Sequence, residues 1–203
     1  MKVKTGRAEP LAPEERRRAI VQAVIPLLVE HGASVTTRQM AEAAGIAEGT
    51  IFRVFADKHA LIHEAVKFSM DPAPIEQGLA QIYPAAPIEV QLAEAARILL
   101  DRMEESIALL SVVRTMHSIG NRGSGPPPFV AAANAAITKS LTGLFERHRE
   151  RLRIEPARAA SAFWGLIFAS GHPIVSRADR LTVDELVGVL LSGIVEPQPE
   201  SVS

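Results

Sequence analysis

Apolar residues recur three and four positions apart along most of this chain, and this spacing constrains its fold more than any other feature. Such spacing places side chains on one face of an α-helix. In the first segment of this kind the recurring residues are Ile20, Ala23, Val24, Leu27 and Leu28. No stretch has a convincing strand pattern. The sequence therefore predicts an all-α fold of about nine helices.

Local signals mark where these helices begin and end. Pro13 is expected to open the first helix, and Thr182 with Glu185 forms a capping box for the last one. Four prolines between residues 72 and 87 predict a linker with one helical turn around residues 77–82. A loop is predicted over residues 120–128, followed by a helix over residues 129–153.

These boundaries predict four parts. Residues 1–12 form a flexible basic arm, residues 13–70 a small three-helix domain, residues 71–195 a larger helical domain, and residues 196–203 a disordered tail. The net charge is −1, but the cations are in excess before residue 71 and the acids after it. This weak asymmetry fits a small DNA-reading domain on a larger neutral domain.

Several classes of function find no support in the sequence. The chain has no cysteine, and it has no nucleotide-binding loop, nucleophile elbow or HExxH motif. We therefore expect no enzyme and no cofactor. His59 and His63 lie four residues apart without an evident third ligand, so no metal site is expected. The polar N-terminus and the interrupted apolar stretch at 159–175 predict a cytoplasmic protein.

The most informative segment is Thr36–Lys58, with the sequence TTRQMAEAAGIAEGTIFRVFADK. It predicts two short helices joined by a tight turn at Gly45, a helix-turn-helix motif over residues 36–55. The inner apolar face would consist of Met40, Ala41, Ala44, Ile46, Ile51 and Phe55. The second helix would then be free to enter the major groove of DNA. An ordinary helical subdomain without DNA has the same geometry and is the alternative.

This segment resembles the DNA-binding domain of the tetracycline-repressor (TetR) family. The matching residues are Thr-Thr before the first short helix, Ala-Gly-Ile at the turn, Gly49-Thr50-Ile51-Phe52, and then Phe55, Lys58 and Leu61. The resemblance implies that DNA is contacted by Thr37, Arg38, Glu48, Gly49, Thr50, Phe52, Arg53 and Lys58. Thr37 and Lys58 would bind phosphates, and Arg38 would bind a phosphate or a guanine edge.

The segment departs from the family pattern at three positions. Position 52 is usually Tyr, and Phe52 has no hydroxyl for a phosphate, although its ring can pack against a sugar or a thymine methyl group. Ala47 replaces a serine that often caps the recognition helix. Glu48 would repel phosphates unless it accepts a hydrogen bond from a cytosine amine.

The larger domain is expected to form a homodimer. Residues 159–169 are apolar on almost all sides, so this helix needs both a core and a partner to cover it. The TetR resemblance places the dimer interface on the last two helices. The predicted interface residues are Phe163, Trp164, Phe168, Leu186, Leu190 and Leu191. The alternative is a core entirely within one chain.

The resemblance also implies an effector site in this domain. The candidate lining is Met103, Ile107, Leu110, Met116, His117, Phe129, Trp164 and Phe168, and plain core packing is the alternative for each. Together these features predict a transcription repressor that binds a palindromic operator in double-stranded DNA as a homodimer. A small apolar or aromatic effector would release it. An enzyme, or a scaffold that has lost DNA binding, are the competing functions.

Overall fold

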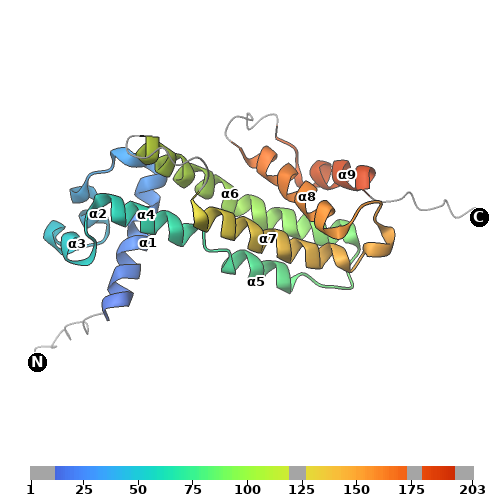
Figure 1. The fold of residues 1–203 in the computed structure, drawn as a ribbon, viewed down its shortest axis with the longest axis horizontal. Coiled ribbons are helices and arrows are strands. Elements are labelled where there is room, and N and C mark those ends of the chain that lie inside the picture. The colour runs from blue at the N-terminus through green and yellow to red at the C-terminus, as the bar shows by residue number, and fades with distance from the viewer. Residues whose placement is uncertain (1–11, 119–126, 173–179, 195–203) are drawn as a thin grey trace, which may run out of the picture. The chain divides into compact units, whose positions relative to one another are not determined.

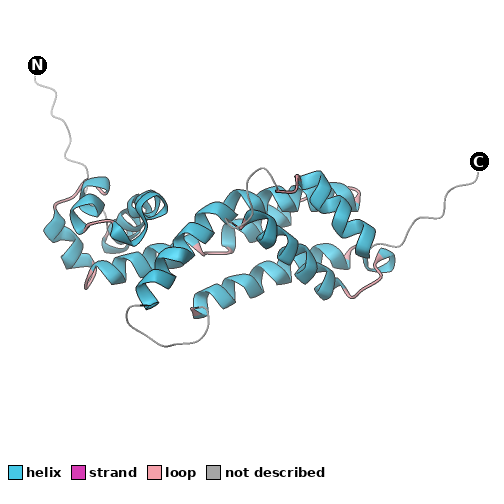
Figure 2. Cartoon of the chain, turned by 90° about the horizontal axis from the view of Figure 1, so that it is seen from above, coloured by secondary structure: helices cyan, strands magenta, loops and turns pink. Residues whose placement is uncertain are grey.

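The computed structural model describes residues 12–118, 127–172 and 180–194 and contains only helices, turns and loops there (Figure 2). The helices are α1 (Pro13–His31), α2 (Thr37–Ala43), α3 (Glu48–Val54), α4 (Lys58–Ser69), α5 (Ala73–Gln81), α6 (Ile88–Ser118), α7 (Pro128–Glu146), α8 (Pro156–Gly171) and α9 (Val183–Ile194). Two short 3-10 turns lie at Gly32–Ser34 and Arg149–Arg151. The all-α prediction is confirmed. The predicted tail and all of the predicted basic arm except Ala12 lie outside the described residues.

The chain divides into two compact units. One unit, here called the head, comprises Met1–Phe68 and Leu109–Asn121. The other, the body, comprises Ser69–Ala108 and Arg122–Ser203. Helix α6 therefore contributes residues to both units. The sequence predicted one domain boundary near residue 70, whereas the head also contains a later part of the chain, from α6.

The head has an apolar core that α1, α2, α3 and α4 build together. Its fully buried side chains include Ile20, Leu28, Met40, Ile51, Leu61 and Ile62. Helix α1 runs without interruption through Pro26, although a proline inside a helix removes a backbone donor and commonly kinks or breaks it. The exposed Pro26 is therefore accommodated within a continuous helix.

The predicted helix starts at Pro13 and Thr182 are confirmed, and a further cap lies at Asp57. Pro13 occupies the first turn of α1. The Asp57 carboxylate accepts a hydrogen bond from the Ala60 amide at 2.7 Å, at the start of α4. The Thr182 hydroxyl accepts from the Glu185 amide at 3.2 Å, while the Glu185 carboxylate accepts from the Thr182 amide at 2.9 Å. Each end is thus stabilised by atoms no more than three residues apart.

Two predicted elements differ from the structure. The segment interpreted as a linker contains α5, in which Ile75 and Leu79 are buried four residues apart. Pro74 does not prevent this helix because it lies in the first turn, where no intrahelical donor is needed. At the other end of the body, α7 stops at Glu146 rather than continuing to Arg153.

In the body, α7 packs against α5 and α8, and α8 packs in turn against α9 (Figure 1). Phe145 of α7 and Phe163 of α8 meet edge to face with ring centroids 6.1 Å apart. The buried Gln91 side chain donates hydrogen bonds to the carbonyls of Pro84 and Ala86 and so fastens the loop before α6. No helix among the described residues has the length and apolar character that crossing a membrane requires.

Candidate nucleic-acid interface

A tight turn joins α2 to α3. Gly45 adopts a left-handed conformation with φ of 65°, which costs a glycine little because it has no Cβ. The Ile46 amide donates to the Ala41 carbonyl at 3.0 Å, and the Gly45 amide donates to the Glu42 carbonyl at 3.1 Å. These bonds satisfy carbonyls at the end of α2 and set the direction of the chain into α3. The predicted helix-turn-helix is present.

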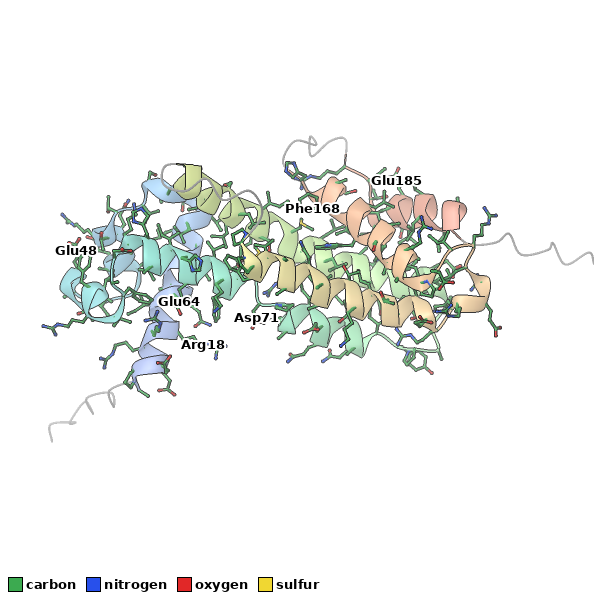
Figure 3. All side chains as sticks on the ribbon, in the orientation of Figure 1. Arg18, Glu48, Glu64, Asp71, Phe168 and Glu185 are labelled. Atoms are coloured by element: carbon green, nitrogen blue, oxygen red, sulfur yellow. The ribbon has the colours of Figure 1, made fainter. Side chains whose placement is uncertain are left out.

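Helix α3 has one buried and one uncovered side. Ile51, within the helix, and Phe55, at its C-terminal cap, are buried in the head. Glu48, Gly49, Phe52 and Arg53 are all exposed, and we call these four residues the outward stripe. Glu48 is labelled at the start of this helix in Figure 3. The stripe follows from helical spacing, because residues 48 and 52, and residues 49 and 53, lie one turn apart.

Phe52 is the unusual member of the outward stripe. Its side chain is 52% exposed, although a ring of this size is normally buried. The core of the head therefore does not account for an aromatic residue at this position. A ring on the surface of a recognition helix can make apolar contact with a thymine methyl group or a sugar.

The start of α2 carries two further predicted DNA contacts. Thr36 caps this helix and exchanges hydrogen bonds with Gln39, and the half-exposed Thr37 is its first residue. The exposed Arg38 donates a hydrogen bond to the Glu42 carboxylate at 2.9 Å, and this bond raises the pKa of Arg38. Arg38 is thus a permanently charged group on the surface.

Lys58 has a structural contact that the sequence did not predict. Its Nζ donates to the Ala33 carbonyl at 2.8 Å and ties the start of α4 to the turn after α1. The side chain is only half-buried. An ammonium group has three donors, so N–H groups remain for a phosphate.

Arg17 is the residue that sequence reasoning missed. Arginines at the start of an exposed helix are usually solvated, but Arg17 donates to the Val54 carbonyl at 2.8 Å and pairs with Glu64. The hydrogen bond to Glu64 raises the pKa of Arg17. Arg18 lies over the Phe68 ring, 5.4 Å from its centroid. Nothing near Arg17 in the sequence signals these partners, because they lie 37 and 47 residues away.

The residues that build this site resemble those of known proteins. Residues 20–65 match the family model described as bacterial regulatory proteins, tetR family. Residues 20–65 are therefore a domain of the tetR family. The matched residues span most of α1 through most of α4, and the resemblance drawn from Thr36–Lys58 is confirmed.

Solved structures share the fold over most of the chain. A protein described as a TetR-family regulator from Mesorhizobium loti is 20% identical, with a TM-score of 0.68 over 92% of this chain and 100% of that one. LfrR from Mycobacterium smegmatis, solved in complex with proflavine, is 22% identical with a TM-score of 0.58 and the same coverage. NalD from Pseudomonas aeruginosa, a secondary repressor of the MexAB-OprM multidrug efflux pump, is 19% identical with a TM-score of 0.56. It also covers 92% of this chain and 100% of its own.

The predicted dimer residues of this chain separate into two groups. Phe163, Leu186 and Leu190 are buried in the core of the protomer itself, so we remove them from the candidate interface. Phe168 is 44% exposed, and Trp164 and Leu191 are half-buried. The sequence did not separate these groups because α8 and α9 are apolar on several sides.

The candidate effector residues are not brought together around one described cavity. Met103 is buried against Gly171, and Ile107, Leu110, Phe129 and Trp164 are half-buried. The side chains of Met116 and His117 lie outside the described part of the structure. Two hollows of about 330 and 290 Å³ occur among the described residues of the body. None of the candidate effector residues lines either of them.

The described segments offer no cluster of side chains that could bind a metal ion. No group of three or more His, Asp or Glu side chains is placed there to hold a metal ion. That the protein has no cofactor and no enzymatic activity stays a prediction.

Proposed function

We propose that this TetR-family regulator is a repressor that binds a palindromic operator as a homodimer and is released by a small apolar or aromatic effector. The observation that carries the DNA-binding part is the outward stripe. Helix α3 is anchored through Ile51 and Phe55, while Glu48, Gly49, Phe52 and Arg53 remain uncovered. A short helix anchored on one side and uncovered on the other is suited to lie in the major groove.

The stripe offers different contacts to DNA along its length. Arg53 can bind a guanine edge with two hydrogen bonds, and Phe52 can contact a thymine methyl group. Glu48 can accept a hydrogen bond from a cytosine amine but would repel phosphate oxygens. Thr37, Arg38 and Lys58 lie outside the stripe and are proposed to bind the backbone, which fixes the register of the protein without reading sequence.

Homodimer formation is supported by apolar surface on α8 and α9. Phe168 on α8 and Val189 on α9 are both exposed, and Trp164 on α8 and Leu191 on α9 are half-buried. Exposed apolar side chains on two packed helices suit a four-helix interface about a twofold axis. Two recognition helices about one turn of DNA apart, roughly 34–36 Å, would then read a palindrome.

The support for an effector comes from the fold shared with LfrR and not from a cavity lined by the candidate residues. LfrR, which shares the fold, was solved with proflavine bound. This supports a planar aromatic compound as the effector class of this chain. Proflavine added to the protein–operator complex is expected to release the DNA, measured as a fall in the fluorescence anisotropy of a labelled operator.

The main experiment is selection of genomic fragments by the purified protein, followed by sequencing. The expected result is one shared palindrome. Binding to that palindrome should then weaken in Arg53→Ala by about 1–3 kcal/mol, the usual value of a good base contact. Arg97→Ala removes the same charge from an exposed position in the body and serves as the matched control.

Two outcomes would contradict the proposal. If the wild-type protein enriches no shared sequence, it does not read an operator. If Arg53→Ala and Arg97→Ala weaken binding equally, the attraction is general charge rather than recognition by α3.

A further inference from the structure

Arg17 lies in the first half of α1 and reaches the end of the recognition helix. Its Nη1 donates to the carbonyl of Val54, the last residue of α3, at 2.8 Å. The last carbonyls of a helix have no partner within the helix and carry its negative dipole end. A guanidinium at this point satisfies one such carbonyl and is favoured by the dipole.

The same guanidinium makes two more contacts. Its Nη2 pairs with the carboxylate of Glu64 on α4, and its plane lies over the Phe55 ring, with 4.5 Å between the guanidinium carbon and the ring centroid. Figure 3 labels Glu64 on α4. Arg17 therefore joins three helices of the head, and its side chain is only 33% exposed.

Helix α3 depends on such outside support. It has only seven residues, and its N-cap, Ala47, makes no side-chain capping bond. A helix of this length is unstable by itself, so contacts at its C-terminal end help to hold its orientation. Phe55, which Arg17 covers, directly follows α3 and is one of the two residues that anchor it.

We propose that Arg17 is a positioning residue for DNA recognition: it holds the C-terminal end of α3 so that the outward stripe faces the bases. This inference rests on the proposed DNA-binding function. Arg17 acts through Val54, Phe55 and Glu64 and not through contact with DNA. Lysine cannot replace it, because an ammonium group has neither the planar fork of N–H donors nor the flat face that lies over the Phe55 ring.

The test is Arg17→Lys, which keeps the charge and removes the fork and the plane. Arg18→Lys is the matched control, since Arg18 is the next residue on α1 and also covers a ring, that of Phe68, which is not part of α3. Affinity for the palindrome selected by the wild type is measured at several salt concentrations, together with affinity for an unrelated duplex of equal length.

We expect Arg17→Lys to bind the palindrome about tenfold more weakly, which corresponds to partial loss of one base contact. Its affinity for the unrelated duplex and its salt dependence should not change, because no phosphate contact is lost. Arg18→Lys should bind as the wild type does. Glu64→Gln should weaken the palindrome complex in the same direction but less.

A second variant separates positioning from loss of stability. Ile20→Val removes a methyl group from the buried part of α1 and destabilises the head while Arg17, Val54, Phe55 and Glu64 are all kept. Melting temperatures of all variants are measured beside their affinities. At an equal fall in melting temperature, Arg17→Lys should lose more affinity for the palindrome than Ile20→Val does.

Three results would overturn the inference. Arg17→Lys could retain wild-type affinity for the palindrome, or lose affinity only in step with its melting temperature as Ile20→Val does. A shallower salt dependence with equal losses on both duplexes would instead make Arg17 a phosphate contact. A wild-type protein that selects no palindrome refutes the proposed function itself, and this result is read before any variant is made.

Discussion

At the scale of single residues, Gly45 and Gly49 of the helix-turn-helix differ in whether the backbone conformation requires a glycine. Gly45 has φ of 65°, and an added Cβ would meet no atom within 4 Å. The backbone conformation alone therefore demands glycine there. Gly49 has no positive φ, and an added Cβ would again meet nothing. The fold does not require glycine at position 49, whereas the proposed close approach of DNA to α3 would favour a residue without a side chain there.

This contrast predicts opposite effects of the same substitution. Gly45→Ala should lower the free energy of unfolding by about 1–2 kcal/mol, the cost of a left-handed residue with a Cβ. Gly49→Ala should leave it unchanged or raise it by up to about 1 kcal/mol, since alanine favours a helix, yet weaken operator binding. Urea unfolding followed by circular dichroism measures the first effect and fluorescence anisotropy the second. Full operator affinity in Gly49→Ala would argue against a close approach of DNA.

At the scale of elements, close contact between α6 and α8 depends on a small residue near the end of α8. A Cβ on Gly171 would lie 2.4 Å from Cγ and 3.2 Å from Cβ of Met103. These atoms are near the backbone of α6 and have little freedom to move. Met103, a candidate for the effector site by sequence, is thus part of the packing between two helices.

We predict that Gly171→Ala destabilises the body by about 1–3 kcal/mol, as overpacking of a core does. The matched control is Gly143→Ala on α7, an exposed position where an added Cβ meets nothing within 4 Å. That variant should gain up to about 1 kcal/mol from helix propensity. Urea unfolding of both variants provides the comparison, and equal stability of the two would contradict the packing argument.

At the scale of the whole molecule, the question is which exposed apolar residues mark an interface. Val189 on α9 is 55% exposed and Val90 on α6 is 46% exposed. Single exposed apolar residues are common on protein surfaces and need no partner. Val189 differs from Val90 because it lies on α9, which together with α8 and its exposed Phe168 forms the proposed dimer interface.

Val189→Glu is therefore expected to dissociate the proposed dimer, whereas Val90→Glu, the same change at similar exposure, should not. Sedimentation equilibrium should give about twice the chain mass of 21.8 kDa for the wild type and for Val90→Glu, and a value close to the chain mass for Val189→Glu. Loss of the dimer should also weaken operator binding, because one head then reads only a half-site. A dimer that persists in Val189→Glu would place the interface elsewhere.

Much of the fold and of the candidate DNA-binding site was predictable because it depends on neighbours in the chain. The first turn at Pro13, the turn at Gly45 and the capping box at Thr182 all act over a few residues. The segment at α5 was misread because Pro74 breaks a helix interior but not a first turn. The capping box of Thr36 and Gln39 likewise acts over three residues.

The sequence by itself determined that this chain is helical, where most of its helices begin, and that it carries the helix-turn-helix of the tetR family. Only the tertiary structure decided that Arg17 supports α3, that Phe163 is core while Phe168 is surface, and that Met103 packs on Gly171. The physical reason is distance along the chain. Helical spacing and caps act within a few residues, whereas an arginine on α1 or an apolar helix such as α8 acquires its role from segments that only folding brings near.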